Sequence, residues 1–496
     1  MSSSNERAPA STGITGLDTI LQGGLPRGEI FLVQGEPGTG KTLLSVQFLQ
    51  AGVEAGESCM IVSLSQSADD LRRNVRGAGL SLEDIEVYDD LPDTAPGNIA
   101  DEQVIFPSEH VEFGETVRAM TEAVKRIAPD RIVFDGVGYL RLLAKSPARY
   151  RRQILALRRF FSERDITVML TDDQSVAPGH GELRSLVYGV MSLEQERTPY
   201  GNNRRKLHVV KLRGVGYVAG THDFRIGSGG LEVFPRLRVD DAAKDERQAT
   251  LTSGLESLDK LLGGGLQEGT SCLIVGPSGT GKTSLATLYM DAAARGGETS
   301  SVFLFDELSG TFMRRSEALG MPVRQHVEDG LMAIQSVGTG QLSPGAFTHL
   351  VRQEVRERDV RVVVIDTLTG YISAMPEESF LVTQMHDLLT YLSKQGILTI
   401  LVVAQHGVIG QQLRGPVDVS YLADAVMLTR HFESKGALRQ AVSVFKKRYG
   451  THERRIRELL IEEGGLSVGD PMEAAQGVLL GHPIRANGDG AQSGVK

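Results

Sequence analysis

The sequence predicts an α/β fold of two tandem domains, each a mostly parallel β-sheet flanked by helices, and three observations support this. A glycine-rich segment and loop in the first half recur 241 positions later. Each half contains continuous β-branched runs, which are typical of parallel strands covered on both faces. Helical charge patterns separate those runs, as right-handed crossovers require. The expected parts are a flexible N-terminus (1–12), a first domain (13–236), a charged linker (237–249), a second domain (250–470) and a partly disordered tail (471–496).

The repeated loop is a phosphate-binding loop. Gly35–Thr42 and Gly276–Thr283 both match G-x-x-x-x-G-K-T, and each follows an apolar strand-like run and precedes a helical pattern. In such a loop the backbone N–H groups wrap phosphate, the Lys reaches the β- and γ-phosphates and the Thr hydroxyl ligates Mg²⁺. The predicted nucleotide-binding residues are Gly38, Thr39, Gly40, Lys41, Thr42 and Leu43, and Ser278, Gly279, Thr280, Gly281, Lys282, Thr283 and Ser284.

An acidic residue ends one buried strand in each half. The runs 131–135 and 362–366 finish at Asp135 and Asp366. A carboxylate at that end of a strand, beside a phosphate loop, is typical of the Walker B acid that orders Mg²⁺. We therefore expect Thr42 with Asp135, and Thr283 with Asp366, to form the metal sites.

Composition excludes several classes of protein. The 496 residues carry a net charge of −9, which argues against a large nucleic-acid surface. Only Cys59 and Cys272 occur, so a disulfide framework is excluded and a reducing cytoplasm is the expected location. No apolar stretch approaches the ~20 residues of a membrane span.

The segments before the two loops identify a family. Gly16-Leu17-Asp18 with Gly23-Gly24-Leu25 is repeated as Ser257-Leu258-Asp259 with Gly264-Gly265-Leu266. Together with the loops and the Walker B acids, this pattern resembles the KaiC family of circadian clock ATPases and autokinases over essentially the whole chain. The resemblance implies RecA-like domains, ATP and Mg²⁺ as cofactors, a double-ringed homohexamer with ATP between subunits, and a KaiB-like protein as a partner.

Two later clusters of cationic residues also resemble family signatures. Lys211-Leu212-Arg213-Gly214 is similar to the K-L-R-G of the first domain, and Phe445–Arg448 followed by His452 is similar to the F-K-x-R…H of the second. The resemblance implies that these segments contact the nucleotide of the adjacent subunit. It adds Lys211, Leu212, Arg213, Lys446, Lys447, Arg448 and His452 to the expected ATP-binding residues.

The chain departs from the family at the residues that activate the attacking group. Family members carry a Glu-Glu pair after the strand that follows the first helix, whereas the first domain here has Ser65 and Gln66. Neither can act as a general base near neutral pH. The second domain has Asp306 and Glu307, which we take as the catalytic residues, with Glu307 also near the metal. We therefore expect the first domain mainly to bind ATP and the second to carry the chemistry.

The expected phosphoacceptor is Ser420. The family has adjacent Ser and Thr acceptors at this position, and here Tyr421 replaces the threonine. Single-site autophosphorylation is therefore expected, since a tyrosine hydroxyl lies several Å further from the backbone than a serine hydroxyl. The tail around residues 477–485 is similar to the family's tail entrance but ends early, so no tail-binding activator is implied.

The leading interpretation is a hexameric ATPase and serine/threonine autokinase in signalling or circadian timing. A ring scaffold that is only held together by ATP is an alternative, which the lost acids of the first domain support for half of the molecule. An ATPase without autophosphorylation is a further alternative. A RecA- or helicase-like DNA motor shares the fold. The negative charge, the absence of Trp and the 5% aromatic content argue against that motor, because base-stacking side chains are scarce.

Overall fold

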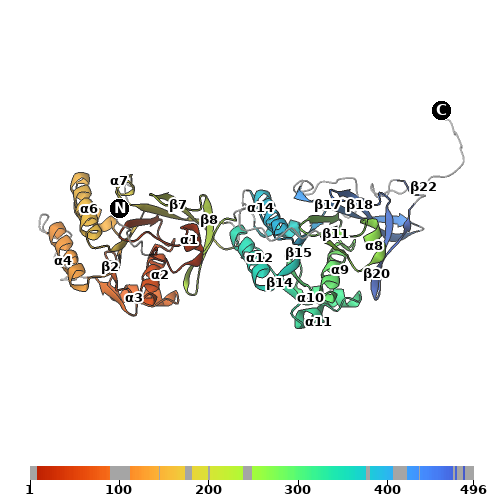
Figure 1. Ribbon diagram of the computed structural model, residues 1–496, viewed down its shortest axis with the longest axis horizontal. Coiled ribbons are helices and arrows are strands. Elements are labelled where there is room, and N and C mark those ends of the chain that lie inside the picture. The colour runs from red at the N-terminus through yellow and green to blue at the C-terminus, as the bar shows by residue number, and fades with distance from the viewer. Residues whose placement is uncertain are drawn as a thin grey trace, which may run out of the picture. The chain divides into compact units, whose positions relative to one another are not determined.

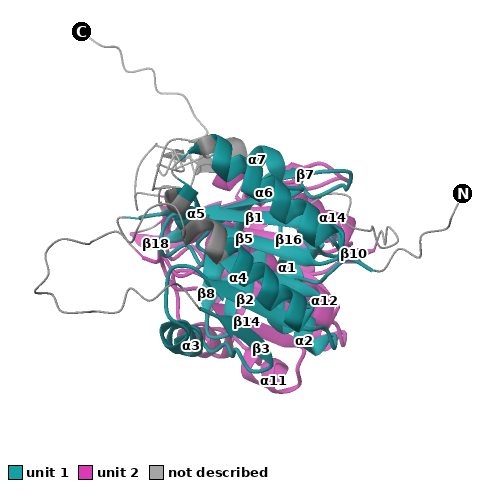
Figure 2. Cartoon of the chain, turned by 90° about the vertical axis from the view of Figure 1, so that its left-hand side faces the viewer, with its two compact units in different colours: residues 1–199, 203–236 teal, residues 200–202, 237–496 magenta. Residues whose placement is uncertain are grey.

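The computed structural model describes residues 8–89, 112–144, 146–173, 181–198, 201–237, 249–375, 380–405, 422–434, 436–472, 475–476 and 484–485. The chain divides into two compact units, shown in different colours in Figure 2: unit 1 comprises residues 1–199 and 203–236, and unit 2 comprises residues 200–202 and 237–496. The predicted acceptor Ser420 and its neighbour Tyr421 lie outside the described residues, as do most of the expected linker and tail.

Unit 1 is built on a nine-stranded sheet with the order β3-β2-β4-β5-β1-β6-β7-β8-β9 (Figure 1). The strands from β3 to β6 are parallel, and β7 to β9 extend the sheet in antiparallel fashion. Its strands are β1 (Ile30–Gly35), β2 (Cys59–Ser63), β3 (Ile85–Tyr88), β4 (Arg131–Asp135), β5 (Thr167–Asp173), β6 (Gly189–Glu196), β7 (Arg204–Leu212), β8 (Thr221–Gly227) and β9 (Gly230–Phe234). Its helices are α1 (Thr15–Ile20), α2 (Lys41–Glu54), α3 (Ala68–Gly77), α4 (Glu112–Ile127), α5 (Gly138–Ala144), α6 (Pro147–Ser162) and α7 (Gly181–Leu186).

Unit 2 repeats this architecture with the order β14-β13-β15-β16-β12-β17-β18-β19-β20. Its main strands are β12 (Ser271–Gly276), β13 (Thr299–Leu304), β14 (Met332–Ser336), β15 (Val360–Asp366), β16 (Leu398–Ala404), β17 (Ala425–Ser434), β18 (Ala437–Lys447), β19 (Arg457–Glu462) and β20 (Gly465–Pro471). Two short pairs join β10 (Thr250–Leu251) to β11 (Leu266–Gln267), and β21 (Ala475–Gln476) to β22 (Ile484–Arg485). Its helices are α8 (Glu256–Leu261), α9 (Lys282–Arg295), α10 (Ser309–Ala318), α11 (Val323–Glu328), α12 (Pro344–Arg358), α13 (Leu368–Ala374) and α14 (Leu381–Lys394).

The central strands are buried on both faces, so their side chains alternate between two apolar clusters. In β1, Phe31 and Val33 pack into one cluster, and Ile30 and Leu32 pack into the cluster on the other face. The strands of unit 2 divide in the same way. This confirms the predicted fold class of two α/β domains with mostly parallel sheets flanked by helices. No described helix is long and apolar enough to cross a membrane.

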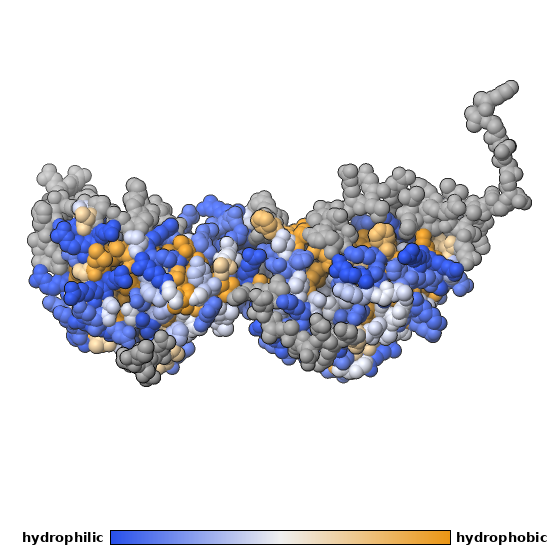
Figure 3. Space-filling model, turned by 45° about the horizontal axis from the view of Figure 1, so that its top comes forward, coloured by the Kyte–Doolittle hydropathy of each residue, from blue (hydrophilic) through white to orange (hydrophobic). Residues whose placement is uncertain are grey.

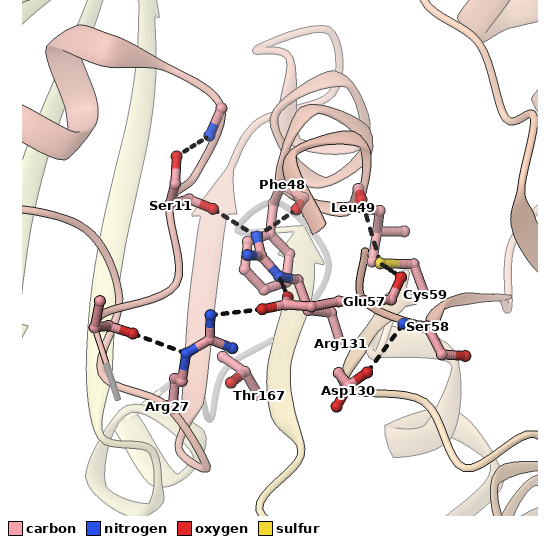
Figure 4. Close-up of polar contacts among 12 residues, drawn as sticks. Ser11, Arg27, Phe48, Leu49, Glu57, Ser58, Cys59, Asp130, Arg131 and Thr167 are labelled. Carbon is pink, nitrogen blue, oxygen red and sulfur yellow. Dashed lines mark hydrogen bonds and ion pairs between the residues drawn. The ribbon is translucent and has the colours of Figure 1, made fainter. Parts of the chain in front are cut away.

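Part of the segment that we expected to be a flexible N-terminus is packed into unit 1. Ala10 pairs with Leu25 through two backbone hydrogen bonds of 2.8 Å, and Ala10 is fully buried. Arg131 donates to the carbonyl oxygen of Ser11 at 2.6 Å while forming a buried ion pair with Glu57 (Figure 4). A charge so deeply buried is tolerated only when it is paired and hydrogen-bonded. Residues 10–12 are therefore part of the domain, and the expected flexibility of 1–12 is wrong for them.

Candidate nucleotide-binding sites

Both phosphate-binding loops follow the carboxyl end of a central strand and open a helix. The first joins β1 to α2, and the second joins β12 to α9. Gly40 and Gly281 precede these helices with φ of 102° and 83°, a left-handed conformation that favours glycine. A Cβ at Gly281 would also lie 2.6 Å from the Cδ1 atom of Ile461. Each loop therefore leads into a helix N-terminus, which is the arrangement that binds phosphate.

The loop lysines fold back onto their own loops. Lys41 Nζ donates to the carbonyl oxygens of Gly35 and Glu36 at 2.8 and 2.9 Å, and Lys282 Nζ donates to that of Pro277 at 2.6 Å. Burial lowers the pKa of Lys41, and it lowers the pKa of Lys282 to about 8, although nearby carboxylates oppose the shift. Phosphate oxygens at these amines would stabilise the charged form of both lysines.

Each loop threonine lies beside its Walker B aspartate. Thr42 Oγ1 is 3.0 and 3.2 Å from the two carboxylate oxygens of Asp135, and Thr283 hydrogen-bonds to Asp366. Burial raises the pKa of Asp366, against the opposing effects of Thr283, Arg315 and Lys282. A hydroxyl and a carboxylate are hard oxygen donors of the kind that hold Mg²⁺. The residues present therefore fit the magnesium sites that the sequence predicts.

Unit 2 brings the predicted catalytic acids to its phosphate loop. A cavity of about 570 Å³ is lined by Asp306, Glu307, Arg315 and Asp366 and by the loop residues Ser278, Gly279, Gly281, Lys282, Thr283 and Ser284. Asp306 accepts a hydrogen bond of 2.6 Å from the Thr367 hydroxyl. Glu307 forms an ion pair with Arg315. Carboxylates, a lysine and a phosphate loop thus line one cavity, as phosphoryl transfer requires.

Unit 1 has the same backbone frame without those acids. The N–H of Leu64 donates to the Asp135 carbonyl at 3.0 Å, and the N–H of Phe305 donates to the Asp366 carbonyl at 2.8 Å. Ser65 and Gln66 therefore occupy the positions of Asp306 and Glu307. The Gln66 amide lies 3.5 Å from the Asp135 carboxylate.

Unit 1 instead carries acidic residues at the end of β5. Asp172 pairs with Arg141 at 2.8 Å, and Asp173 is the carboxylate with the largest electrostatic effect on Lys41. The corresponding positions of β16 in unit 2 are Val403 and Ala404, because Asp173 aligns with Gly35 and Ala404 with Gly276. The two phosphate-binding sites are therefore electrostatically unlike.

The cationic clusters lie at the edge of each sheet formed by the amino ends of β1 and β12, whereas the loop of each unit follows the carboxyl end of the same strand. Leu212 pairs with Gly189, which is level with Phe31, whereas the loop follows Gly35. Four residues of strand separate the two edges by roughly 13 Å. In unit 2, Lys447 pairs with Ala425 level with Cys272, which again lies at the edge opposite the loop.

These cations are held by local contacts. Lys211 donates to the carbonyl oxygen of Val187 at 2.8 Å, and Lys446 donates to that of Ala423 at 2.9 Å. Arg448 pairs with Asp424 at 2.8 Å. The structure thus places no described residue of the two clusters at the loop of its own unit.

The comparisons identify the family. A family model described as the KaiC ATPase matches residues 10–238 and 251–473. The chain belongs to the KaiC ATPase family. It is similar to the circadian clock protein KaiC3 of Synechocystis sp., with 26% identity over 490 residues that cover 95% of this chain and 94% of the relative. Circadian clock oscillator proteins KaiC of Parathermosynechococcus lividus and Prochlorococcus marinus are each 26% identical, covering 96% and 98% of this chain and 88% and 97% of their own. Membership in the KaiC family establishes an ATP-binding protein of the ATPase class.

Two polar neighbours of the sites were absent from the sequence prediction. Thr171, on strand β5 between β4 and β1, donates a hydrogen bond of 2.6 Å to the Asp135 carboxylate. Arg315 contacts Glu307 from two turns into α10. The spacing of Arg315 from Glu307 could have indicated it, because Arg315 follows Glu307 by eight positions and the polar residue Asn74 follows Gln66 by the same number.

Proposed function

We propose that this chain is an ATPase and serine/threonine autokinase that works as a homohexamer in cytoplasmic signalling or circadian timing. Unit 1 mainly binds ATP, and unit 2 carries out phosphoryl transfer. The observation that supports this division is the acidic pair Asp306 and Glu307 beside the unit 2 loop, where unit 1 has Ser65 and Gln66. A KaiB-like protein is the partner proposed from the family.

The proposed chemistry assigns one task to each group of unit 2. Lys282 and the loop N–H groups hold the phosphates. Thr283 and Asp366 would hold Mg²⁺, which neutralises charge on the β- and γ-phosphates when bound. Glu307, aided by Asp306, takes the proton from the attacking water or hydroxyl. Gln66 has no basic site for that step and can only orient a water.

Two features of the described surface support a ring. The cationic clusters lie at the end of the sheet opposite the loop of their own unit, so we expect the phosphates bound to a neighbouring subunit to accept their charge. Hydrophilic residues make up much of the surface in Figure 3, with apolar patches between them. In the segment of the second cluster, Phe445 is 68% exposed and Tyr449, which follows Arg448, is 49% exposed. Exposed aromatic and arginine side chains are typical of protein interfaces.

Assembly should depend on nucleotide bound to unit 1. Lys41→Ala removes the lysine that would hold the phosphates there, so the ring loses the stabilisation that a ligand bound between subunits provides by mass action. We expect a hexamer in saturating Mg-ATP for the unchanged protein and smaller species for Lys41→Ala, measured by light scattering. A monomer for the unchanged protein under these conditions would refute the ring.

The ring scaffold without phosphoryl transfer remains the second candidate, because unit 1 has Ser65 and Gln66 in place of the acidic pair. Intact-mass spectrometry after incubation with Mg-ATP separates the two functions. An added phosphate supports the autokinase, and turnover without added phosphate supports an ATPase only. A DNA motor would instead show ATP turnover that rises with single-stranded DNA.

A further inference from the structure

Glu307 and Arg315 form an ion pair inside the unit 2 cavity. Arg315 Nη1 lies 3.0 and 2.9 Å from the two carboxylate oxygens of Glu307. The Glu307 side chain is 19% exposed and that of Arg315 is 37% exposed, so water screens the pair only in part. Glu307 lies two residues before the first residue of α10, and Arg315 reaches back toward the helix N-terminus, the direction in which helical side chains lean.

Unit 1 has two uncharged residues, Gln66 and Asn74, at the positions of Glu307 and Arg315. Asn74 Nδ2 donates to Gln66 Oε1 at 3.0 Å. Asn74 is the seventh residue of α3, and Arg315 is the seventh residue of the equally long α10. The contact between these two positions is thus present in both units. Both of its residues are uncharged in unit 1, and both are charged in unit 2. A residue that holds the Glu307 carboxylate in place needs a positive charge, and Arg315 has one.

Other carboxylates close to Glu307 repel its side chain. Asp366 on β15 repels Glu307 electrostatically, and Asp306 is its neighbour in the chain. Among the described residues, the cations that line the cavity with this group are Lys282 from α9 and Arg315 from α10. Lys282 is hydrogen-bonded to the loop, which leaves Arg315 in contact with Glu307. Repulsion would otherwise move Glu307 away from the other carboxylates.

We propose that Arg315 is a positioning residue that holds the Glu307 carboxylate in the orientation needed to accept a proton during phosphoryl transfer. This inference rests on the proposed role of Glu307 as the base. Phosphoryl transfer needs reacting atoms about 3–3.5 Å apart, and a 1 Å misplacement can lower the rate on the order of 10²-fold. Arg315 acts through Glu307 and not on the phosphates.

A double-mutant cycle tests the inference. The variants are Arg315→Asn, Glu307→Gln and the double variant, and Asn is the residue that unit 1 already accommodates at this position. We expect Arg315→Asn to lower kcat by roughly 10- to 100-fold with KM for ATP changed less than about 2-fold. It should have no further effect in the Glu307→Gln background, and Arg315→Lys should restore part of the rate. Thermal unfolding and binding of a fluorescent ATP analogue should match the unchanged protein.

Other results would overturn the inference. An equal loss from Arg315→Asn in both backgrounds, or weaker ATP binding, would mean that Arg315 acts on the phosphates. A lower unfolding temperature accompanying the rate loss would mean a structural role. Full turnover for Arg315→Asn together with lost turnover for Glu307→Gln would overturn the inference alone. Full turnover for Glu307→Gln would overturn the proposed function and this inference with it.

Discussion

Glu307→Gln protein is expected to bind ATP and to lose most of its turnover. Glutamine nearly matches glutamate in size but cannot take a proton, and loss of a general base costs roughly 10²–10⁴-fold in rate. The phosphate loop and the Walker B aspartate are untouched by the change, so the affinity for ATP should remain. The measurement is steady-state phosphate release together with binding of a fluorescent ATP analogue.

The matched control for this change is Gln66→Ala. Gln66 occupies the equivalent position in unit 1 and has no basicity to lose, so its removal should alter turnover little. If Glu307→Gln kept the rate of the unchanged protein while Gln66→Ala lowered it, unit 1 would be the active site and the assignment would be reversed.

Ser420→Ala protein is expected to take up no phosphate from ATP. The described residues that follow Ser420 support transfer between subunits. The Asp424 N–H donates to the carbonyl oxygen of Ser271 at 2.9 Å, at the amino end of β12 and therefore at the edge opposite the unit 2 loop. Arg448 pairs with Asp424 at this same edge. Ser420 lies outside the described residues, and we expect its phosphate to come from ATP that is bound to Lys282 and Thr283 of an adjacent subunit.

Phosphopeptide mapping is the direct test of this acceptor. Ser420→Thr keeps a hydroxyl near the backbone and should retain incorporation, which makes it the control for Ser420→Ala. A phosphate would add roughly −1.5 to −2 charge, which the cations Lys446 and Arg448 would be expected to offset. Phosphate on Tyr421 alone, or unchanged incorporation in Ser420→Ala, would show that the acceptor is another residue.

The fold and the phosphate loops could be predicted because their signals are local. A buried strand is a continuous apolar run, and the loop motif specifies its own conformation through glycines. Element ends were less predictable. For example, α6 spans Pro147–Ser162, although the i, i+4 charge pattern of this segment runs over 150–164; proline suits the first helical turn, and Asp165 takes a φ of 55°.

Contacts between distant segments could not be predicted from one sequence. The packing of residues 10–12 depends on Arg131, about 120 positions away, and the burial of that arginine has no sequence signature. Arg315 resembles any surface cation of an amphipathic helix until α10 places it against Glu307. The edge occupied by the cationic clusters likewise follows from strand register, which motif matching does not supply.

The central claim is that unit 2 performs the phosphoryl transfer while unit 1 holds ATP. Phosphate release by Lys282→Ala protein tests it most directly, because the unit 1 loop that we expect to hold the ring together stays intact. With a hexamer verified by light scattering, the claim predicts that release falls to the level of the Glu307→Gln protein. Release close to that of the unchanged protein would contradict the claim, and it would make Asp173, beside Lys41, the acid to examine in unit 1.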